Sequence, residues 1–302
     1  MTGVARHGPA LARRRLVLAF GSCALPFIGA TASANTPMVA SGPRLVRIGG
    51  SGGAMMVLRR LADAYRETGA DIEVVALPPL GSEGGIGALV ANRLDIAASG
   101  RPATAAEAPG VRHDDLPLGW TPLPFVVHES VPVTGLTLAE VVRIYNGEIG
   151  TWPDGSRIRI VRRPSANGDF QRLCDLSPAL SAALNAAERR RGLFTAANGQ
   201  ENAEALETVR GAFGAMSMSQ IAVEGRRVRP LELDGISPAF HGARGARYPV
   251  RKPLHLLLPT TPSLAALGLM NFARSPRGRA LLLSLGYEPP SAELGAADAP
   301  RP

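Results

Sequence analysis

Residues 81–102 have the sequence GSEGGIGALVANRLDIAASGRP, which combines a glycine-rich segment, a helical pattern and an apolar run. The glycine-rich segment covers 81–85. Ile86 begins a spacing of apolar residues that is typical of a helix, and the run over 94–98 is typical of a buried strand. We therefore predict a loop, a helix and a strand in this order.

The same alternation extends in both directions from this stretch. Before it, residues 45–48 predict a strand, a glycine-rich segment follows, 57–65 have helical spacing, and 72–77 predict a second strand. After it, we predict helices over 137–145, 165–173, 202–209, 263–272 and 276–285, and strands over 158–161, 212–216 and 254–258. Strands that alternate with helices indicate an α/β fold with mostly parallel sheets.

Three segments join a predicted strand to a predicted helix, at 51–54, 81–85 and 163–169. A helix start leaves backbone N–H groups unpaired and carries partial positive charge, and glycine lets an anion approach the backbone. Such segments can bind an anion, to which Ser82 would add a hydroxyl and Arg163 a bidentate fork. The alternative is that the small residues only form tight turns, and the pattern leaves both interpretations open.

Several classes of function lack their motifs in this chain. There is no GxxxxGK[ST] motif, the only lysine is Lys252, and the glycines at 50 and 52 do not fit the dinucleotide-binding fingerprint. The pattern GxSxG occurs only at residues 49–53 (GGSGG), with glycine at both variable positions, and an HExxH helix and a dense cluster of His and Asp are missing. We therefore expect neither an enzyme nor a metal or cofactor site.

Residues 1–34 have the features of a secretory signal peptide. An arginine cluster precedes an apolar run over 16–28, and small residues at 32–34 suit cleavage near Ala34. This pattern predicts export to the periplasm, by either the general or the twin-arginine route. The alternatives are a membrane anchor and a lipoprotein modified at Cys23.

The charge of the chain is moderate once this segment is removed. The formal net charge is +8, and the four arginines of residues 1–34, which include no acid, account for half of it. A mildly basic protein suits an anionic ligand and does not require a nucleic acid partner.

Six segments together resemble one family. They are residues 81–102, LTLAEVVRIYNGEIGTW (136–152), VRRPSANGDF (161–170), GAFGAMS (211–217), YPVRKPLHLLLP (248–259) and LGYEPP (285–290). In sequence and in order they resemble the periplasmic phosphate-binding proteins of ABC transporters, within the type 2 periplasmic binding protein superfamily. The resemblance covers nearly all of the chain after residue 34, and the set is more specific than any one segment.

The resemblance implies two α/β lobes, each a mostly parallel sheet flanked by helices, joined by two crossing strands near 122–127 and 248–258. The first lobe would contain 43–122 and 253–302, and the second lobe 125–248. An oxyanion would bind in the dry cleft between the lobes, which would close about the crossings as hinges. Separately, the Pro, Ala and Asp content from about 288 onwards predicts that much of this tail is disordered.

The resemblance also implies ligand-binding positions, and some match the family closely. Ser82, Arg163 and Gly168 stand at the family's ligand serine, arginine and glycine. Gly53 and Ala54 replace a threonine and an aromatic residue, so only the backbone donors are kept there.

Other positions depart from the family. Asn167 and Asp169 stand where serine and threonine are usual, and Glu83 replaces a second serine. The aspartate that pairs with the ligand arginine falls at Ser165, so that this pair is missing.

The largest departure is Gly100, where phosphate binders have an aspartate that accepts the ligand proton. Such an acceptor favours hydrogen phosphate over sulfate, which has no proton to donate and meets a repelling carboxylate. Glu83 and Asp169 could replace it, and we hypothesise that Asp169 accepts the ligand proton. The alternative is that Asp169 only caps its helix. An unchanged preference for phosphate over sulfate in Asp169→Asn would contradict the hypothesis.

Arg101 either points into the cleft and binds the anion or lies on the surface, and the sequence does not decide between these positions. The candidate ligand-binding residues are Gly53, Ala54, Ser82, Arg101, Arg163, Asn167, Gly168 and Asp169.

These observations predict a monomeric periplasmic protein that captures phosphate, or a related tetrahedral oxyanion, for an ABC permease in the inner membrane. We expect no nucleic acid partner. The same fold could instead bind another oxyanion or serve a sensory role without a transporter. A secreted phosphatase-type hydrolase is the least favoured alternative.

Overall fold

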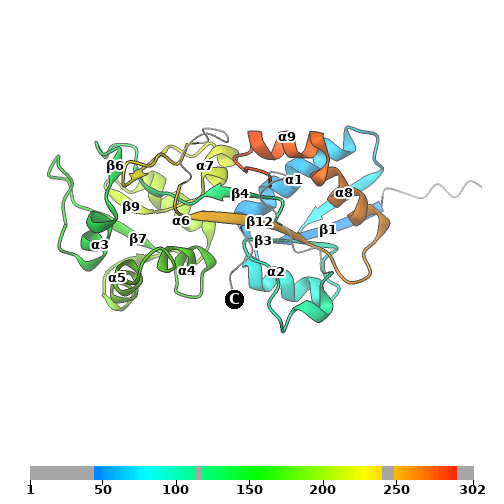
Figure 1. Ribbon diagram of the computed structural model, residues 1–302, viewed down its shortest axis with the longest axis horizontal. Helices are drawn as coiled ribbons and strands as arrows, with labels where there is room; N and C mark the ends of the chain where they lie inside the picture. Colours follow the sequence, from blue (N-terminus) through cyan, green and yellow to red (C-terminus); the bar gives the residue numbers. More distant parts are fainter. Residues whose placement is uncertain (1–43, 113–116, 240–247, 291–302) are drawn as a thin grey trace, which may run out of the picture. The chain divides into compact units, whose positions relative to one another are not determined.

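Two five-stranded sheets, each flanked by helices, make up most of the described chain (Figure 1). The structure is a computed structural model and describes residues 44–112, 117–239 and 248–290. The predicted signal peptide lies outside these ranges, and so does the predicted tail from 291 onwards. No helix within the described ranges is both long enough and apolar enough to cross a membrane.

The first lobe is defined here as the first sheet with its helices. Its elements are β1 (Arg44–Gly50), α1 (Gly52–Arg66), β2 (Ile72–Ala76), α2 (Gly81–Val90), β3 (Ile96–Ser99), β4 (Gly119–Pro122), β12 (Arg251–Leu257), α8 (Leu264–Arg274) and α9 (Pro276–Ser284), with a short 3₁₀ helix at Ala108–Gly110. The strand order is β2-β1-β3-β12-β4. Strand β1 is parallel to β2 and β3, whereas β12 is antiparallel to β3 and β4.

The second lobe is the second sheet with its helices. Its elements are β5 (Phe125–His128), β6 (Gly135–Leu136), α3 (Leu138–Asn146), β7 (Arg159–Arg162), α4 (Gly168–Cys174), α5 (Pro178–Arg189), β8 (Phe194–Thr195), α6 (Gly199–Thr208), β9 (Ala212–Ala215), α7 (Met218–Glu224), β10 (Val228–Pro230) and β11 (Glu232–Leu233). The strand order is β10-β5-β9-β7-β8, and β6 pairs separately with β11. Strand β7 is parallel to β8 and β9, whereas β5 is antiparallel to β9 and β10.

The two-lobe α/β fold expected from the sequence is confirmed, but the sheets are mixed rather than mostly parallel. All antiparallel pairings involve β5 or β12, the two strands by which the chain enters a lobe from the other one. Each of these strands enters its sheet from the side of the other lobe, so it runs antiparallel to the strands next to it. The crossings are bonded to each other, since Leu123 N–H donates to Val250 O over 2.9 Å.

The sequence predicted a loop over the glycine-rich segment 81–85, and this prediction is wrong. The segment forms the first turn of α2. Glycine is accepted there because α2 packs closely on β1: a Cβ at Gly85 would lie 2.6 Å from the Cα of Gly50. Helix α1 likewise begins at Gly52, inside the other glycine-rich segment. Gly85 thus serves close helix–strand packing.

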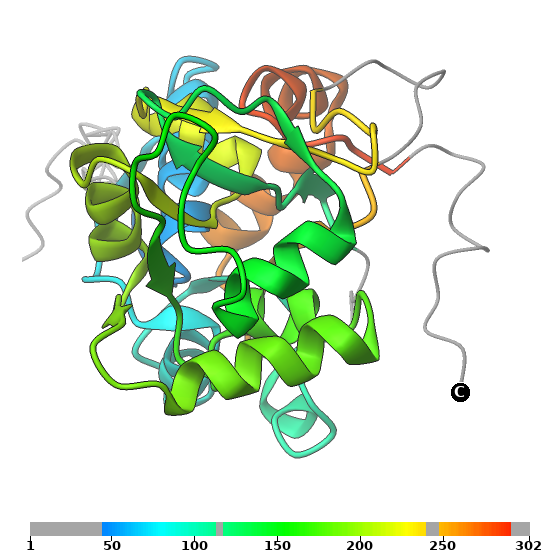
Figure 2. The same cartoon turned by 90° about the vertical axis from the view of Figure 1, so that its left-hand side faces the viewer.

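Each lobe has a main hydrophobic core of its own. In the first lobe, Ile48, Leu58 and Leu269 are fully buried between the sheet and its helices. In the second, the rings of Phe125 and Phe213 stack with centroids 5.6 Å apart. Figure 2 brings α3 and α5 to the front, where they pack side by side over this second core.

The expected tail begins as ordered chain. The N–H of Glu288 donates to Trp120 O over 2.8 Å, and the carboxylate of Glu288 accepts from Arg251 over 3.0 Å. The segment after α9 is therefore tied to β4 and β12, and only its part from 291 onwards lies outside the described residues.

Candidate functional site

The first turns of α1 and α2 lack the side-chain cap that the other helices have. Neither Ser51 nor Leu80, the N-cap residues, makes a cap hydrogen bond with its side chain. Each of the helices α3 to α9 has an N-cap side chain that accepts from a first-turn N–H. Gly53 and Ala54 lie in the first turn of α1, and Ala54 is buried. Two of the predicted anion-binding segments thus keep backbone donors that no cap occupies.

Ser82 lies in the first turn of α2 and faces the end of β3. Its Oγ accepts a hydrogen bond from the N–H of Gly100 over 3.0 Å. A Cβ at Gly100 would lie 3.7 Å from this oxygen. Ser82 and Gly100, two positions that the resemblance singled out, are therefore neighbours.

Arg163, Asn167, Gly168 and Asp169 lie in the second lobe, between the end of β7 and the first turn of α4. Arg163 Nη1 donates to Ala196 O over 3.1 Å. Asn167 caps α4, because its Oδ1 accepts from the N–H of Asp169 over 3.0 Å. The N-cap of α4 is therefore Asn167 and not, as the alternative interpretation held, Asp169. The Asp169 side chain makes other contacts.

Asp169 forms an ion pair with Lys252, which the sequence did not single out as a site residue. Lys252 Nζ lies 2.7 Å from Asp169 Oδ1, and the two side chains are only 17% and 21% exposed. Lys252 belongs to β12 of the first lobe and Asp169 to α4 of the second. The contact therefore joins the two lobes at their crossing.

Arg172 makes a second contact between the lobes. Its Nη2 donates to Gly100 O over 2.8 Å, although Gly100 follows β3 and Arg172 lies on α4. Gly100 thus contacts Ser82 through its N–H and Arg172 through its carbonyl group.

The electrostatics of this cluster are dominated by positive charge. Burial raises the pKa of Asp169, but Lys252, Arg163 and Arg172 outweigh it and hold that pKa below its usual value. Burial lowers the pKa of Arg163 and of Arg172. Asp169 opposes this for both, with smaller effects from Glu201 on Arg163 and from Asp175 on Arg172, but only in part. Three cations therefore surround one carboxylate, and the two arginines are desolvated without full compensation. A bound anion would supply the missing negative charge.

Arg101 is not joined to this cluster by any contact within the described ranges. Its guanidinium forms a bidentate pair with Glu107, with N–O distances of 2.8 and 2.9 Å. This hydrogen bonding raises the pKa of Arg101, and the nearby charge of Glu83 adds to the effect. Glu83 itself is exposed. The pair fixes the segment after β3 rather than presenting Arg101 to the Asp169 carboxylate.

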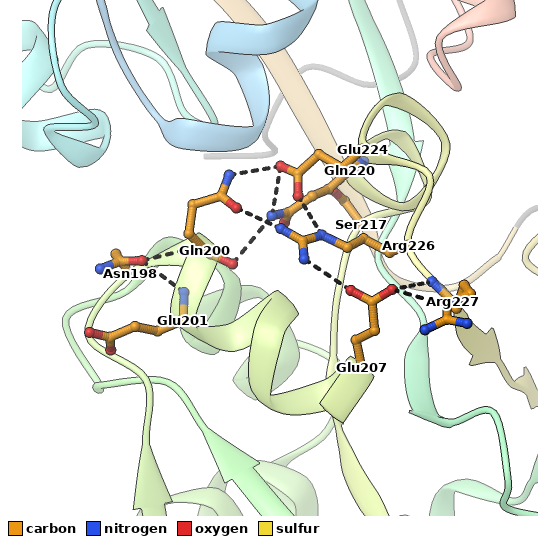
Figure 3. A network of polar contacts seen from close by, with 10 residues as sticks. Asn198, Gln200, Glu201, Glu207, Ser217, Gln220, Glu224, Arg226 and Arg227 are labelled. Carbon is orange, nitrogen blue, oxygen red and sulfur yellow. Dashed lines mark hydrogen bonds and ion pairs between the residues drawn. The ribbon is translucent and has the colours of Figure 1, made fainter. Parts of the chain in front are cut away.

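A polar network in the second lobe supports the backbone that holds Arg163 (Figure 3). Arg226 binds Glu224 over 2.8 Å, Glu207 over 3.0 Å and the carboxamide of Gln200 over 2.8 Å. Gln220 bridges Glu224 and the carbonyl of Gly199. These bonds fix the start of α6 at Gly199. Ala196, whose carbonyl accepts from Arg163, lies three residues before it.

Gln220 also faces the first turn of α1 from the second lobe. A Cβ at Gly53 would lie 3.9 Å from both the Cβ and the Oε1 of Gln220. The buried side chain of Gln220 therefore brings a hydrogen-bonding group next to the uncapped N–H groups of α1.

A larger cavity lies away from these residues. About 840 Å³ in volume, it is bordered by β7, β8 and α6 and contains none of the predicted site residues. Arg190, on its wall, is already bound to Tyr145 O over 3.2 Å. A cavity of about 20 Å³, room for one water molecule, borders both Arg163 and Asp169. Within the described ranges, no group of three His, Cys, Asp or Glu side chains could hold a metal ion.

A family model described as a PBP superfamily domain matches residues 32–277. The chain belongs to the PBP superfamily. A search of curated proteins gave no match. Among solved structures, a protein from Clostridium perfringens described as a phosphate ABC transporter substrate-binding protein, with bound phosphate, is 18% identical with a TM-score of 0.70; the alignment covers 82% of this chain and all of that one.

Two further solved structures also share the PBP superfamily fold. An ABC-type phosphate transport receptor from Vibrio cholerae is 20% identical, with a TM-score of 0.56 and coverage of 81% of this chain and 100% of the other. A phosphate-binding protein from Stenotrophomonas maltophilia is 15% identical, with a TM-score of 0.58 and coverage of 82% and 91%. At these identities the likeness establishes the fold, and the ligand of this PBP superfamily member has to be argued from its own residues.

Sequence reasoning missed Lys252, Arg172 and Gln220, which lie where the two lobes meet. Arg172 follows Asp169 by three positions, a spacing that places both on one face of a helix. Lys252 is the only lysine of the chain and lies in the predicted second crossing. Gln220 gave no signal, because its helix α7 was not predicted.

Proposed function

We propose that this protein is a solute-binding protein that captures phosphate, or a related tetrahedral oxyanion, between its two lobes. The observation that carries the proposal is the cluster of Arg163, Arg172 and Lys252 around the single carboxylate of Asp169. Arg163 stands at the position of the family's ligand arginine, so the resemblance and the local charge point to the same place. Ser82, which contacts Gly100, can supply a neutral donor, and the first turns of α1 and α2 keep backbone N–H groups that no side chain caps.

Capture would work by lobe closure rather than by chemistry. We infer that the two crossings are hinges, which places the lobe boundaries after Pro122 and before Arg251. Arg172 and Lys252 already bridge the lobes through Gly100 and Asp169. An anion between the lobes would add attraction to cations of both, so its binding free energy favours the closed state.

The wider role follows from the family and from the predicted signal peptide. We propose that the mature protein acts in the periplasm and delivers its anion to an ABC permease in the inner membrane. The three structural neighbours are described as phosphate transport or phosphate-binding proteins, which supports this proposal by analogy of fold.

Removal of Arg163 tests the proposal directly. In calorimetric titrations with phosphate, Arg163→Met should weaken binding by about 100-fold or more, because a buried charge-assisted contact is lost. Arg93→Gln removes the same charge from the exposed turn after α2 and should bind phosphate like the unchanged protein. Thermal unfolding of both variants shows whether they are folded.

Two results would contradict the proposal. One is equal phosphate binding by the unchanged protein and by a folded Arg163→Met. The other is turnover of a chromogenic phosphate ester, since a protein that only binds anions cannot perform it.

A further inference from the structure

The space beside Gly100 is occupied by the side chain of Lys252. A Cβ at Gly100 would lie 3.0 Å from Lys252 Cε. Any larger residue at position 100 would therefore have to displace the lysine stem. In the family that this chain resembles, an aspartate stands at the position of Gly100. Here a cationic side chain fills the neighbouring space, so the local charge is reversed.

Asp169, the carboxylate that contacts Lys252, does not act as an unpaired negative charge in the way that the family's aspartate would. Asp169 is in contact with the Lys252 ammonium at 2.7 Å, and the charges of Arg163, directly after β7, and of Arg172, on α4, also act on it. Tyr287, after α9, is the other titratable group close enough for Asp169 to affect its pKa. Asp169 itself is therefore faced by three positive charges, while Glu201 adds weaker negative charge beside Arg163 and Asp175 beside Arg172.

Sulfate is rejected by a phosphate site when it meets an uncompensated carboxylate and cannot donate a proton. In this cluster the negative charge of Asp169 is already compensated by the ammonium. Because the pKa of Asp169 lies below its usual value, it stays ionised and paired across the neutral range. The site then has neither an uncompensated carboxylate that repels sulfate nor a free carboxylate that needs a proton from the ligand.

We propose that Lys252, aided by Arg172, makes this site accept fully ionised oxyanions, so that sulfate binds as well as hydrogen phosphate. The inference rests on the proposed function and specifies its ligand class. Selection is by charge and size, and the ligand needs no proton.

The first test compares the two anions on the unchanged protein by calorimetry at pH 6 and pH 8. Sulfate should bind within about tenfold of phosphate at pH 8. Sulfate affinity should change little between the two pH values, because neither sulfate nor Asp169 changes its charge there. Phosphate affinity should rise roughly five- to tenfold as the doubly charged ion replaces the singly charged one.

The second test removes the charges singly and together. Lys252→Met leaves the Asp169 carboxylate without its ammonium partner, so sulfate affinity should fall about 100-fold. Phosphate affinity should fall by about tenfold at most. The double variant Lys252→Met/Asp169→Asn also removes the charge of that carboxylate, and sulfate binding should recover. Arg93→Gln removes a distant, exposed charge, so it should leave the phosphate-to-sulfate ratio unchanged.

The outcomes separate this inference from the function on which it rests. Phosphate binding with sulfate rejected by more than about 100-fold, and loss of this preference in Asp169→Asn, would overturn the inference alone and identify Asp169 as the proton acceptor. No binding of either anion to the folded protein would overturn the proposed function and the inference with it.

Discussion

Gly100 and Lys252 show how one position can change the meaning of a ligand site. A glycine normally suggests a turn or a close backbone approach, and Gly100 does contact Ser82 and Arg172 through its backbone. Its lack of a side chain also leaves the space that the Lys252 stem fills. The two residues are therefore best understood together, because the glycine leaves room for the lysine stem.

The Arg101–Glu107 pair predicts a specific response to acid. This pairing lowers the pKa of Glu107 to about 2. The stabilisation is complete above the ordinary glutamate pKa of about 4.3 and is lost as the pH falls towards 2. Between pH 6 and pH 3.5 the unchanged protein should lose about 1 kcal/mol of unfolding free energy that Glu107→Gln does not lose.

Urea unfolding at the two pH values measures this difference. Glu73→Gln, which removes an exposed glutamate on β2, serves as the control and should lose stability with acid as the unchanged protein does. An identical acid response in Glu107→Gln would show that the pair adds nothing to stability.

The sequence indicated two of the segments that lie near each other in the structure, the start of α2 and residues 163–169. They contain five of the candidate ligand residues: Ser82, Arg163, Asn167, Gly168 and Asp169. The sequence could not place Arg101, because its partner Glu107 lies in a segment without a helical or strand pattern. It also could not anticipate Lys252, since one lysine on a predicted strand has no motif around it. Contacts between lobes depend on the tertiary arrangement, which local periodicity does not contain.

Helix α2 offers a matched pair of substitutions on one element. Gly85→Ala would force a Cβ to within 2.6 Å of Gly50, whereas a Cβ at Gly87 meets no other atom within 4 Å. Gly85→Ala should therefore lower the unfolding free energy by about 1–3 kcal/mol, and Gly87→Ala should raise it by about 0.5–1 kcal/mol.

Chemical unfolding of the two α2 variants gives both values in one experiment. Because Ser82 lies on the same helix, Gly85→Ala should also weaken phosphate binding, and Gly87→Ala should not. Equal stabilities would mean that α2 does not pack on β1 as closely as described.

The elements predicted from the sequence were those with strong local patterns. Helix α3 has its capping box, in which Thr137 and Glu140 bond reciprocally, and an αL glycine at its end, Gly147. Helix α5 was missed although Ser177-Pro178 is a good start and Leu180, Ala183, Leu184 and Ala187 recur at helical spacing on its buried face. Helix α7 has only seven residues, too few to show a period. The antiparallel strands β5 and β12 were predicted as crossings, but their pairing depends on the other lobe.

Anion binding between the lobes should stabilise both lobes equally. At 100 times the dissociation constant, phosphate should raise the unfolding free energy by about 2.7 kcal/mol. The chain has two tryptophans, Trp120 on β4 of the first lobe and Trp152 in the core of the second. Trp152→Phe and Trp120→Phe thus leave one fluorescent reporter in each lobe.

Fluorescence-detected urea unfolding of these two variants, with and without phosphate, checks the prediction. The two transitions should shift by the same amount, because the proposed site has cations of both lobes, Lys252 of the first and Arg163 of the second. A shift of the Trp152 signal alone would mean that the anion is held by the second lobe without closure.

The solitary lysine has a practical consequence for following the protein in mixtures. Besides the chain terminus, Lys252 carries the only primary amine, and its side chain is 17% exposed beside Asp169. An acylating reagent would therefore add one mass increment at a single internal position. A bound oxyanion would shield that position, so the fraction acylated, read by mass spectrometry, would report how much of the protein is occupied in an unpurified extract.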